Sequence, residues 1–183
     1  DYADDVASLA EQLAAPPILI GWSMGGLVAM LAAERTDACA LVGLAPSTPA
    51  AGRAPSKPLR EGVFGSEEYG ITDLDPDAEQ PAMFDLDREE RAIALASRSP
   101  ESRYARDERA AGVAVPEIHC LALIVTSTGD AQWPRSRYDG MHLPVEHMSV
   151  DGASHWGLVL NRRVLAELVP RVVAWIDGAI RAY

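Results

Sequence analysis

The hydrophobic and polar positions of the first part of the chain alternate between helical periodicity and short apolar runs. Residues 2–14 predict a helix, ended by Pro16-Pro17, whose inward side chains are Val6, Leu9, Ala10 and Leu13. Residues 18–20 (ILI) are wholly apolar and predict a strand buried on both faces. Residues 24–35 return to helical composition, and residues 39–44 (CALVGL) predict a second buried strand. This order implies parallel strands joined by right-handed crossovers.

Residues 45–115 interrupt this order, because they carry most of the prolines, many charges and no strong strand. A connection of this length is unusual in a compact domain. We therefore expect residues 49–115 to be a helical insertion, a cap or lid, on an α/β core formed by residues 1–48 and 116–183.

Two helices are predicted within the insertion. Asp87 followed by Glu90 has the pattern of a capping box and opens a helix that runs to about Ser97. Ser99-Pro100 has the pattern of an N-cap and first helical residue, and the helix it opens is expected to end near Gly112.

The alternation resumes after the insertion. Residues 120–126 (CLALIVT) predict a third buried strand and residues 145–150 a fourth. Residues 158–181 predict a closing helix, which Pro170 should kink or divide. Its inward side chains are expected to be Leu158, Leu165, Leu168, Val172, Trp175 and Ile176.

Composition narrows the class of protein. The 183 residues are 48 % hydrophobic and carry a net charge of −11, with a sequence pI near 4.7. So acidic a chain is a poor partner for phosphate backbones or anionic lipid, so we expect no nucleic-acid and no membrane partner. The only cysteines, Cys39 and Cys120, open apolar runs and are expected to be buried free thiols, which favours a cytoplasmic protein without a disulfide framework.

The chemistry centres on Gly21-Trp22-Ser23-Met24-Gly25, between a predicted strand and a predicted helix. Such a turn strains the backbone of the serine and presents its hydroxyl, and the glycines are expected to leave room where side chains would collide. The start of the helix aims free amides at the site, so the backbone N–H of Met24 is a candidate oxyanion donor. A Gly-rich turn with an incidental serine is the alternative interpretation.

His155 is the candidate base for Ser23, because a serine hydroxyl is a weak nucleophile until a base removes its proton. It lies in a loop of small residues, DGASHWG, after the fourth predicted strand, and so at the same sheet edge as Ser23. His119, His142 and His147 are expected to be structural or surface residues without metal-ligand spacing, and no metal or cofactor is expected.

Asp130 is the candidate acid that orients His155, because it directly follows the third predicted strand. Asp139 and Asp151 are the alternatives. Nothing fixes Asp139 in its connection, and Asp151 is so close to His155 in the chain that a turn-forming role is favoured.

The order Ser23, Asp130, His155 resembles that of the α/β-hydrolase superfamily. The resemblance extends over nearly the whole chain, through GWSMGG, LALIVTSTGD and DGASHWGLV. It implies acyl transfer to water, in which Ser23 attacks, His155 acts as base and then acid, and Asp130 holds His155.

The chain departs from the family at its start. The family has about eight strands. Its second oxyanion donor comes from a loop well before the nucleophile elbow, which is the turn of residues 21–25 in this chain. Here only the helix of residues 2–14 precedes the strand of residues 18–20 that leads into the elbow, the elbow strand. We expect the four predicted strands to be the C-terminal portion of the family's sheet. Three explanations stay open: an incomplete or processed chain, which we favour, a second polypeptide that supplies the missing strands, or pairing of two copies along the elbow strand.

The expected substrate is a small or medium apolar acyl compound with an ester, thioester or lactone bond. Trp22 and Trp156 flank the predicted nucleophile and base and are candidates for its pocket. The near-helical series Arg98, Arg103, Arg106 and Arg109 is interpreted as a solvated face, with binding of an acidic substrate as the alternative. A non-catalytic small-molecule-binding protein, or one half of a complemented assembly, is the alternative function.

Overall fold

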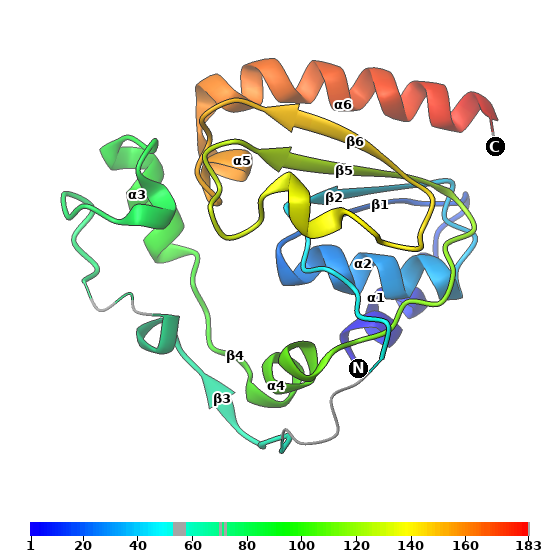
Figure 1. Cartoon of the computed structure of the whole chain (residues 1–183), viewed down its shortest axis with the longest axis horizontal. Coiled ribbons are helices and arrows are strands. Elements are labelled where there is room, and N and C mark those ends of the chain that lie inside the picture. The colour runs from blue at the N-terminus through cyan, green and yellow to red at the C-terminus, as the bar shows by residue number, and fades with distance from the viewer. Residues whose placement is uncertain (53–57, 70, 72, 183) are drawn as a thin grey trace.

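The computed structural model describes residues 1–52, 58–69, 71 and 73–182. Its main sheet contains β1 (Ile18–Trp22), β2 (Ala40–Leu44), β5 (Leu121–Ser127) and β6 (Val145–Val150), in the order β1-β2-β5-β6. All neighbouring pairs are parallel, as the alternation of helices and strands predicts. The carboxyl ends of the four strands therefore share one edge, which faces α3 in Figure 1.

Helices cover the two faces of this sheet (Figure 1). On one face, α1 (Tyr2–Ala10) packs on α2 (Met24–Arg35), and α2 packs on β1 and β2. There Leu27 and Met30 meet Leu41 and Ile124 in one buried cluster. On the other face, α6 (Arg162–Ala182) contributes Leu168 and Ile176 to a second cluster. The sheet side of that cluster comes from Val42, Leu123 and Val125. Alternate residues of each strand therefore serve opposite cores.

The elbow strand β1 is buried on one face only, so the prediction of burial on both faces is wrong. Leu19 is 8 % exposed, but Ile20 is 58 % exposed. In the register Ile20 lies beside Val42, on the face that α6 covers farther along the sheet. Within the described residues β1 pairs only with β2 and is the edge strand, and this covering helix does not extend over it.

The first helix is shorter than predicted. It ends at Ala10, residues 11–15 form turns, and Ala3 and Ala7 are its buried residues. The predicted inward residue Leu9 is 65 % exposed, and Leu13 is also exposed. The predicted inward residue Val6 does pack against the core cluster. The packing of α1 on α2 is therefore made by Val6 and the small Ala3 and Ala7, whereas Leu9 and Leu13 point away.

The segment between β2 and β5 holds α3 (Arg88–Ala96), α4 (Arg103–Ala111) and a two-stranded ribbon of β3 (Val63–Phe64) and β4 (Glu101–Ser102). It arches away from the sheet on the side of the strands' carboxyl ends (Figure 1). Residues 53–57, 70 and 72 of the predicted insertion lie outside the described part of the chain.

Helix boundaries in this segment follow local capping. Asp87 and Glu90 form the predicted capping box of α3, and each side chain accepts the other's backbone N–H at 2.9 Å. The predicted start at Ser99-Pro100 is wrong, because residues 101–102 pair with β3. The cap of α4 is Ser102, whose Oγ accepts the N–H of Ala105 at 3.3 Å. Gly112 ends α4 with φ +105°, as expected of a C-terminal glycine.

The closing helix is divided, although not at Pro170. A short α5 (Gly157–Leu160) precedes α6, and Asn161 separates them by accepting the N–H groups of Arg163 and Val164 on its side chain. The longer helix continues through Pro170. Its buried and half-buried residues include the predicted Leu168, Val172, Trp175 and Ile176.

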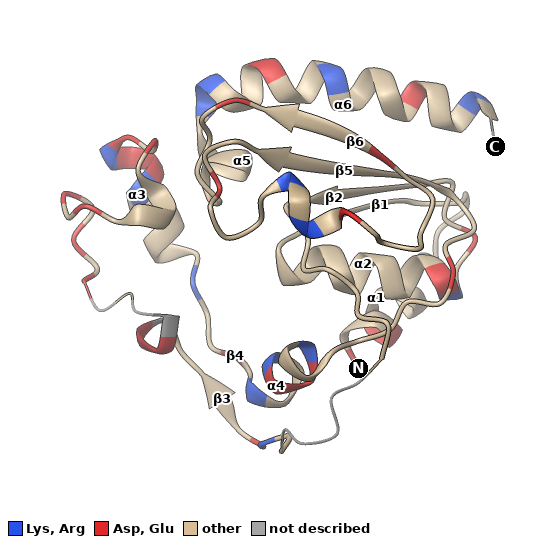
Figure 2. Cartoon of the chain, viewed as in Figure 1, with Lys and Arg blue, Asp and Glu red and all other residues tan. Residues whose placement is uncertain are grey.

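Charge is almost absent from the sheet, where Glu146 is the only Asp, Glu, Lys or Arg of the four strands. Figure 2 shows the charged residues instead along the outer surfaces of α3, α4 and α6 and in the loops. None of the described helices is long and apolar enough to cross a bilayer. Among the described residues no cluster of three or more His, Cys, Asp or Glu side chains has metal-binding geometry. Cys39 and Cys120 are both free thiols; Cys39 is buried and Cys120 half-buried.

Candidate active site

Ser23 occupies a strained turn between β1 and α2. Its backbone has φ +54° and ψ −123°, a combination that a residue with a Cβ rarely adopts and that costs about 1–3 kcal/mol. The turn is fixed by three backbone hydrogen bonds. The Ser23 N–H donates to Leu44 O at 3.0 Å, and the Ser23 carbonyl accepts from Gly26 N–H and Ser47 N–H at 3.1 and 2.8 Å. The Ser23 hydroxyl does not cap α2, so it remains available for other chemistry.

Two glycines beside this turn leave room that a side chain would fill, but only one of them is among the two that the sequence predicts. A Cβ on Gly21 would lie 2.2 Å from the Gly25 carbonyl oxygen. A Cβ on Gly26 would lie 2.4 Å from Pro46 Cβ, a requirement that sequence reasoning did not single out. A Cβ on Gly25 would meet nothing within 4 Å, so the expectation of a collision there is wrong. Close packing of β1 and the β2 loop against α2 explains the first two positions.

His155 and Asp130 form a buried hydrogen-bonded pair. His155 Nδ1 lies 2.6 Å from Asp130 Oδ2, and the two residues are 9 % and 4 % exposed. The other Asp130 oxygen accepts the backbone N–H groups of Gln132 and Trp133 at 3.0 and 3.1 Å. With Nδ1 engaged, Nε2 is the nitrogen left for proton exchange.

The pKa of Asp130 is lowered despite its burial. Desolvation is the largest influence and would raise the pKa. The hydrogen bond and charge of His155, together with the amides of Trp133 and Gln132, act in the opposite direction and prevail. The carboxylate is therefore ionised at neutral pH, as required of a group that stabilises an imidazolium.

Ser23 and His155 line the same cavity, which has a volume of about 300 Å³. Trp22, Met24 and Trp156 also line it, so the structure brings the predicted nucleophile, base, oxyanion donor and pocket residues together. As the first residue of α2, Met24 has an N–H without an intrahelical acceptor. Asp130 does not line this cavity and bonds His155 from a buried position.

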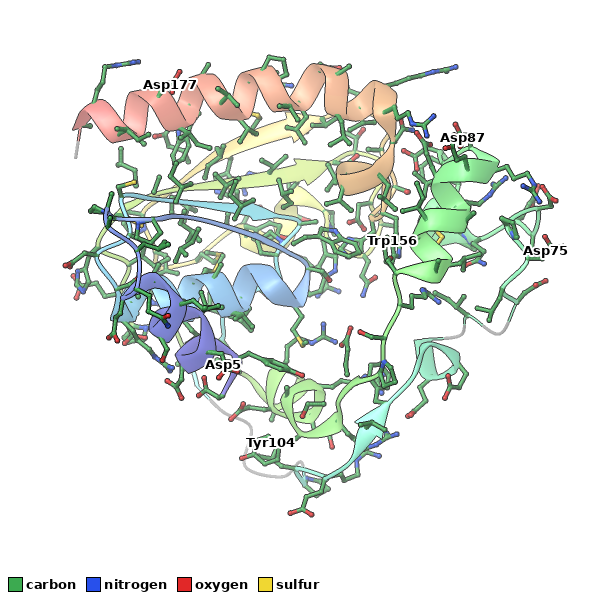
Figure 3. All side chains as sticks on the ribbon, turned by 180° about the vertical axis from the view of Figure 1, so that it is seen from behind. Asp5, Asp75, Asp87, Tyr104, Trp156 and Asp177 are labelled. Atoms are coloured by element: carbon green, nitrogen blue, oxygen red, sulfur yellow. The ribbon has the colours of Figure 1, made fainter. Side chains whose placement is uncertain are left out.

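Two aromatic residues frame the cavity. The Trp22 and Trp156 rings meet edge to face with centroids 4.5 Å apart, and the Trp22 ring lies 5.0 Å from the imidazole of His155. The Trp156 backbone N–H donates to Ala82 O at 3.3 Å, and its side chain packs with Met83 and Leu86. Figure 3 shows Trp156 between the end of the sheet and α3.

The rival residues lie apart from this pair. Asp139 forms an exposed ion pair with Arg135 at 2.7 Å, and Asp151 is exposed. His142 bonds the carbonyl oxygen of Val115 at 2.8 Å, and His119 and His147 are exposed. These histidines have the surface or structural positions predicted for them.

Two cationic residues of the cavity were not among the predicted site residues. Arg98 and Arg109 line it together with Glu101 and Gln132. The near-helical spacing of the arginines was the only signal, and it predicted a solvated face, with binding of an acidic substrate as the alternative. Arg98 and Arg109 are half-buried and line the cavity, a position that the favoured interpretation did not predict.

A family model described as the alpha/beta hydrolase family matches residues 1–168. The match covers most of the chain, and the chain belongs to this family. The protein is thus an enzyme of the hydrolase type with the α/β-hydrolase fold, as the resemblance of its motifs implied. No curated protein sequence matches the chain significantly.

Solved structures share this fold at low sequence identity. Tomato methylketone synthase I with 2-tridecanone is 15 % identical, with a TM-score of 0.67 over 98 % of this chain and 78 % of that one. Polyneuridine aldehyde esterase is 14 % identical, with a TM-score of 0.61 over 94 % and 78 %. Monoacylglycerol lipase from Paleococcus ferrophilus is 17 % identical, with a TM-score of 0.62 over 97 % and 74 %.

Proposed function

We propose that the protein is a serine hydrolase that cleaves an ester, thioester or lactone bond of a small or medium acyl substrate through an acyl-enzyme. The observation that carries the proposal is the buried His155–Asp130 hydrogen bond of 2.6 Å beside a cavity that Ser23 lines. The volume of about 300 Å³ lies at the lower end of small-molecule sites, which favours a small acyl group. The esterases and the lipase among the structural neighbours are consistent with ester-like substrates.

In the proposed mechanism, Ser23 Oγ attacks the substrate carbonyl carbon while His155 Nε2 accepts the hydroxyl proton. The carbonyl oxygen becomes an oxyanion, which the Met24 N–H and the positive end of α2 stabilise. The intermediate collapses as His155 gives its proton to the leaving oxygen or sulfur, and the acyl group remains on Ser23. Water, deprotonated by His155, then releases the carboxylic acid and restores Ser23.

The remaining parts of the proposed site have supporting roles. Asp130 holds the His155 ring and stabilises its positive charge. Trp22 and Trp156 provide apolar walls for the acyl chain. Residues 49–115 act as a cap, consistent with the position of the described part of this segment beyond the strands' carboxyl ends (Figure 1).

A fluorophosphonate probe tests the proposal, since it reacts with activated serines. We expect covalent labelling of the wild-type protein at Ser23, found by peptide mass spectrometry, and no labelling of Ser23→Ala. Hydrolysis of p-nitrophenyl acetate and butyrate should follow the same pattern. Ser136→Ala is a matched control on a short helical turn outside the cavity. Turnover that survives in Ser23→Ala contradicts the proposal, and absence of both labelling and turnover favours a binding protein.

A further inference from the structure

The cap arginines divide into two groups by their partners. Arg60 makes a two-pronged ion pair with Asp107, at 2.8 and 2.7 Å. Arg103 pairs with Glu68, and Arg106 lies over the ring of Phe64 at 4.0 Å from its centroid. These three cations are engaged by the cap's own acidic and aromatic side chains, so they stabilise the segment rather than wait for a ligand.

Arg109 differs from these residues. Its Nη1 donates to Ser47 Oγ at 3.4 Å, a long contact with a neutral hydroxyl, and the ion pairs among residues 1–52, 58–69, 71 and 73–182 do not include it. Ser47 is 1 % exposed, and its N–H donates to the Ser23 carbonyl at 2.8 Å. Two hydrogen bonds thus connect the guanidinium of Arg109 to the elbow. A guanidinium has five N–H donors, so most of its capacity remains for a ligand in the cavity that it lines.

Arg98 approaches the cavity from the histidine side. Its guanidinium carbon lies 5.7 Å from the ring centroid of Trp156, which follows His155 in the chain. Such stacking orients a guanidinium. Arg98 and Arg109 thus place two guanidinium groups around one cavity, which Glu101 also lines.

We infer that Arg98 and Arg109 form a subsite for one carboxylate at the far end of the substrate's acyl chain. The class of substrate would be the monoester or monothioester of a short dicarboxylic acid. A planar guanidinium and a carboxylate match in two-pronged geometry, and Arg109 keeps N–H donors free for such a contact. This subsite rests on the proposed hydrolase function, and it narrows the acyl group to an apolar stem with an anionic end.

Two esters of equal chain length test the subsite. Mono-p-nitrophenyl glutarate ends in a carboxylate, whereas p-nitrophenyl pentanoate ends in a methyl group. After subtraction of the uncatalysed rates, we expect wild-type kcat/KM to favour the glutarate by about tenfold or more. In Arg109→Gln this preference, the ratio of the two kcat/KM values, should be largely lost, and Arg109→Lys should restore part of it. Arg98→Gln should lower the preference less, because its guanidinium is shared with Trp156.

Arg106→Gln is the matched control, since Arg106 neighbours Phe64 and Glu68 instead of the cavity. Thermal unfolding of each variant separates loss of fold from loss of the subsite. An unchanged preference in folded Arg109→Gln overturns the inference, and so does an equal loss on both esters. A preference that falls as much in Arg106→Gln overturns it as well.

A binding measurement separates the subsite from the reaction. Trp22 and Trp156 line the cavity, so tryptophan fluorescence can follow binding of monomethyl glutarate or methyl pentanoate to Ser23→Ala. We expect tighter binding of the glutarate ester, weakened about tenfold or more by adding Arg109→Gln. If wild-type protein hydrolyses neither ester but this difference is found, the proposed hydrolase function fails while the anion subsite stands. If hydrolysis depends on Ser23 but the two ligands bind equally, the subsite fails alone.

Discussion

The indole N–H of Trp22 donates a hydrogen bond to the backbone carbonyl oxygen of His155 at 3.1 Å. These residues are 133 positions apart, and the bond connects the elbow of Ser23 directly to the histidine loop. The Trp22 ring also lies 5.0 Å from the imidazole. The position of His155 relative to Ser23 is therefore held by Trp22, through the backbone, as well as by Asp130, which bonds the imidazole Nδ1.

Replacing Trp22 with Phe removes this donor and keeps an aromatic ring. We expect kcat for p-nitrophenyl butyrate to fall about three- to tenfold, because a neutral hydrogen bond contributes about 1 kcal/mol to holding the loop. Trp175→Phe on α6 is the control, since Trp175 packs in the core away from the cavity, and its kcat should stay near that of the wild type. Equal kcat values for wild type and Trp22→Phe would show that the bond does not position His155.

Replacing Asp130 with Asn tests which carboxylate orients the base. The amide keeps the shape but cannot stabilise the imidazolium, so kcat should fall by roughly 10³- to 10⁴-fold. Asp139→Asn and Asp151→Asn should each change kcat by less than about twofold, because both residues are on the surface. A larger loss in either of these variants than in Asp130→Asn would assign the role to the other carboxylate.

The lowered pKa of Asp130 predicts a pH-dependent contribution to stability. A carboxyl whose pKa is lower in the folded state binds fewer protons there than in the unfolded chain, where its pKa is about 3.9. Its contribution is complete above that unfolded value and is lost as the pH falls through the folded value. Urea unfolding at pH 3 to 7 should therefore give a wild-type minus Asp130→Asn difference that decreases below about pH 4. A difference that stays constant or grows toward acid pH would contradict the lowered pKa.

Local sequence patterns were sufficient for most of the sheet. The sequence predicted all four strands of the main sheet to within about two residues. For β1, β2 and β5 the signal was a continuous apolar run, which burial between layers requires. The capping box of Asp87 and Glu90 was equally readable, since both partners lie within one turn. The exposed face of β1 could not be predicted from the sequence. Burial of Ile20 depends on where α6 lies, and no local pattern encodes the position of that helix.

The features of the candidate site also divide into those that the sequence predicts and those that depend on tertiary packing. Topology alone places residues that follow parallel strands at one sheet edge, and this predicts that Ser23, Asp130 and His155 lie together. The bond from Trp22 to the His155 carbonyl and the entry of Arg98 and Arg109 into the cavity depend on tertiary packing. A periodic series of arginines predicts a polar face, but what that face meets is decided by how the segment folds over the sheet.

The contrast between Gly21 and Gly25 gives a last prediction about the elbow. A methyl group at position 21 would approach the Gly25 carbonyl to 2.2 Å, so β1 and the start of α2 would have to separate. We expect Gly21→Ala to lower the free energy of unfolding by roughly 2–3 kcal/mol, as overpacked sites do, and to abolish labelling of Ser23. Gly25→Ala introduces no contact within 4 Å, and in a helix it should leave stability unchanged or raise it by about 0.5–1 kcal/mol. Urea unfolding monitored by circular dichroism measures both values, and a Gly21→Ala protein as stable as Gly25→Ala would refute this account of the turn.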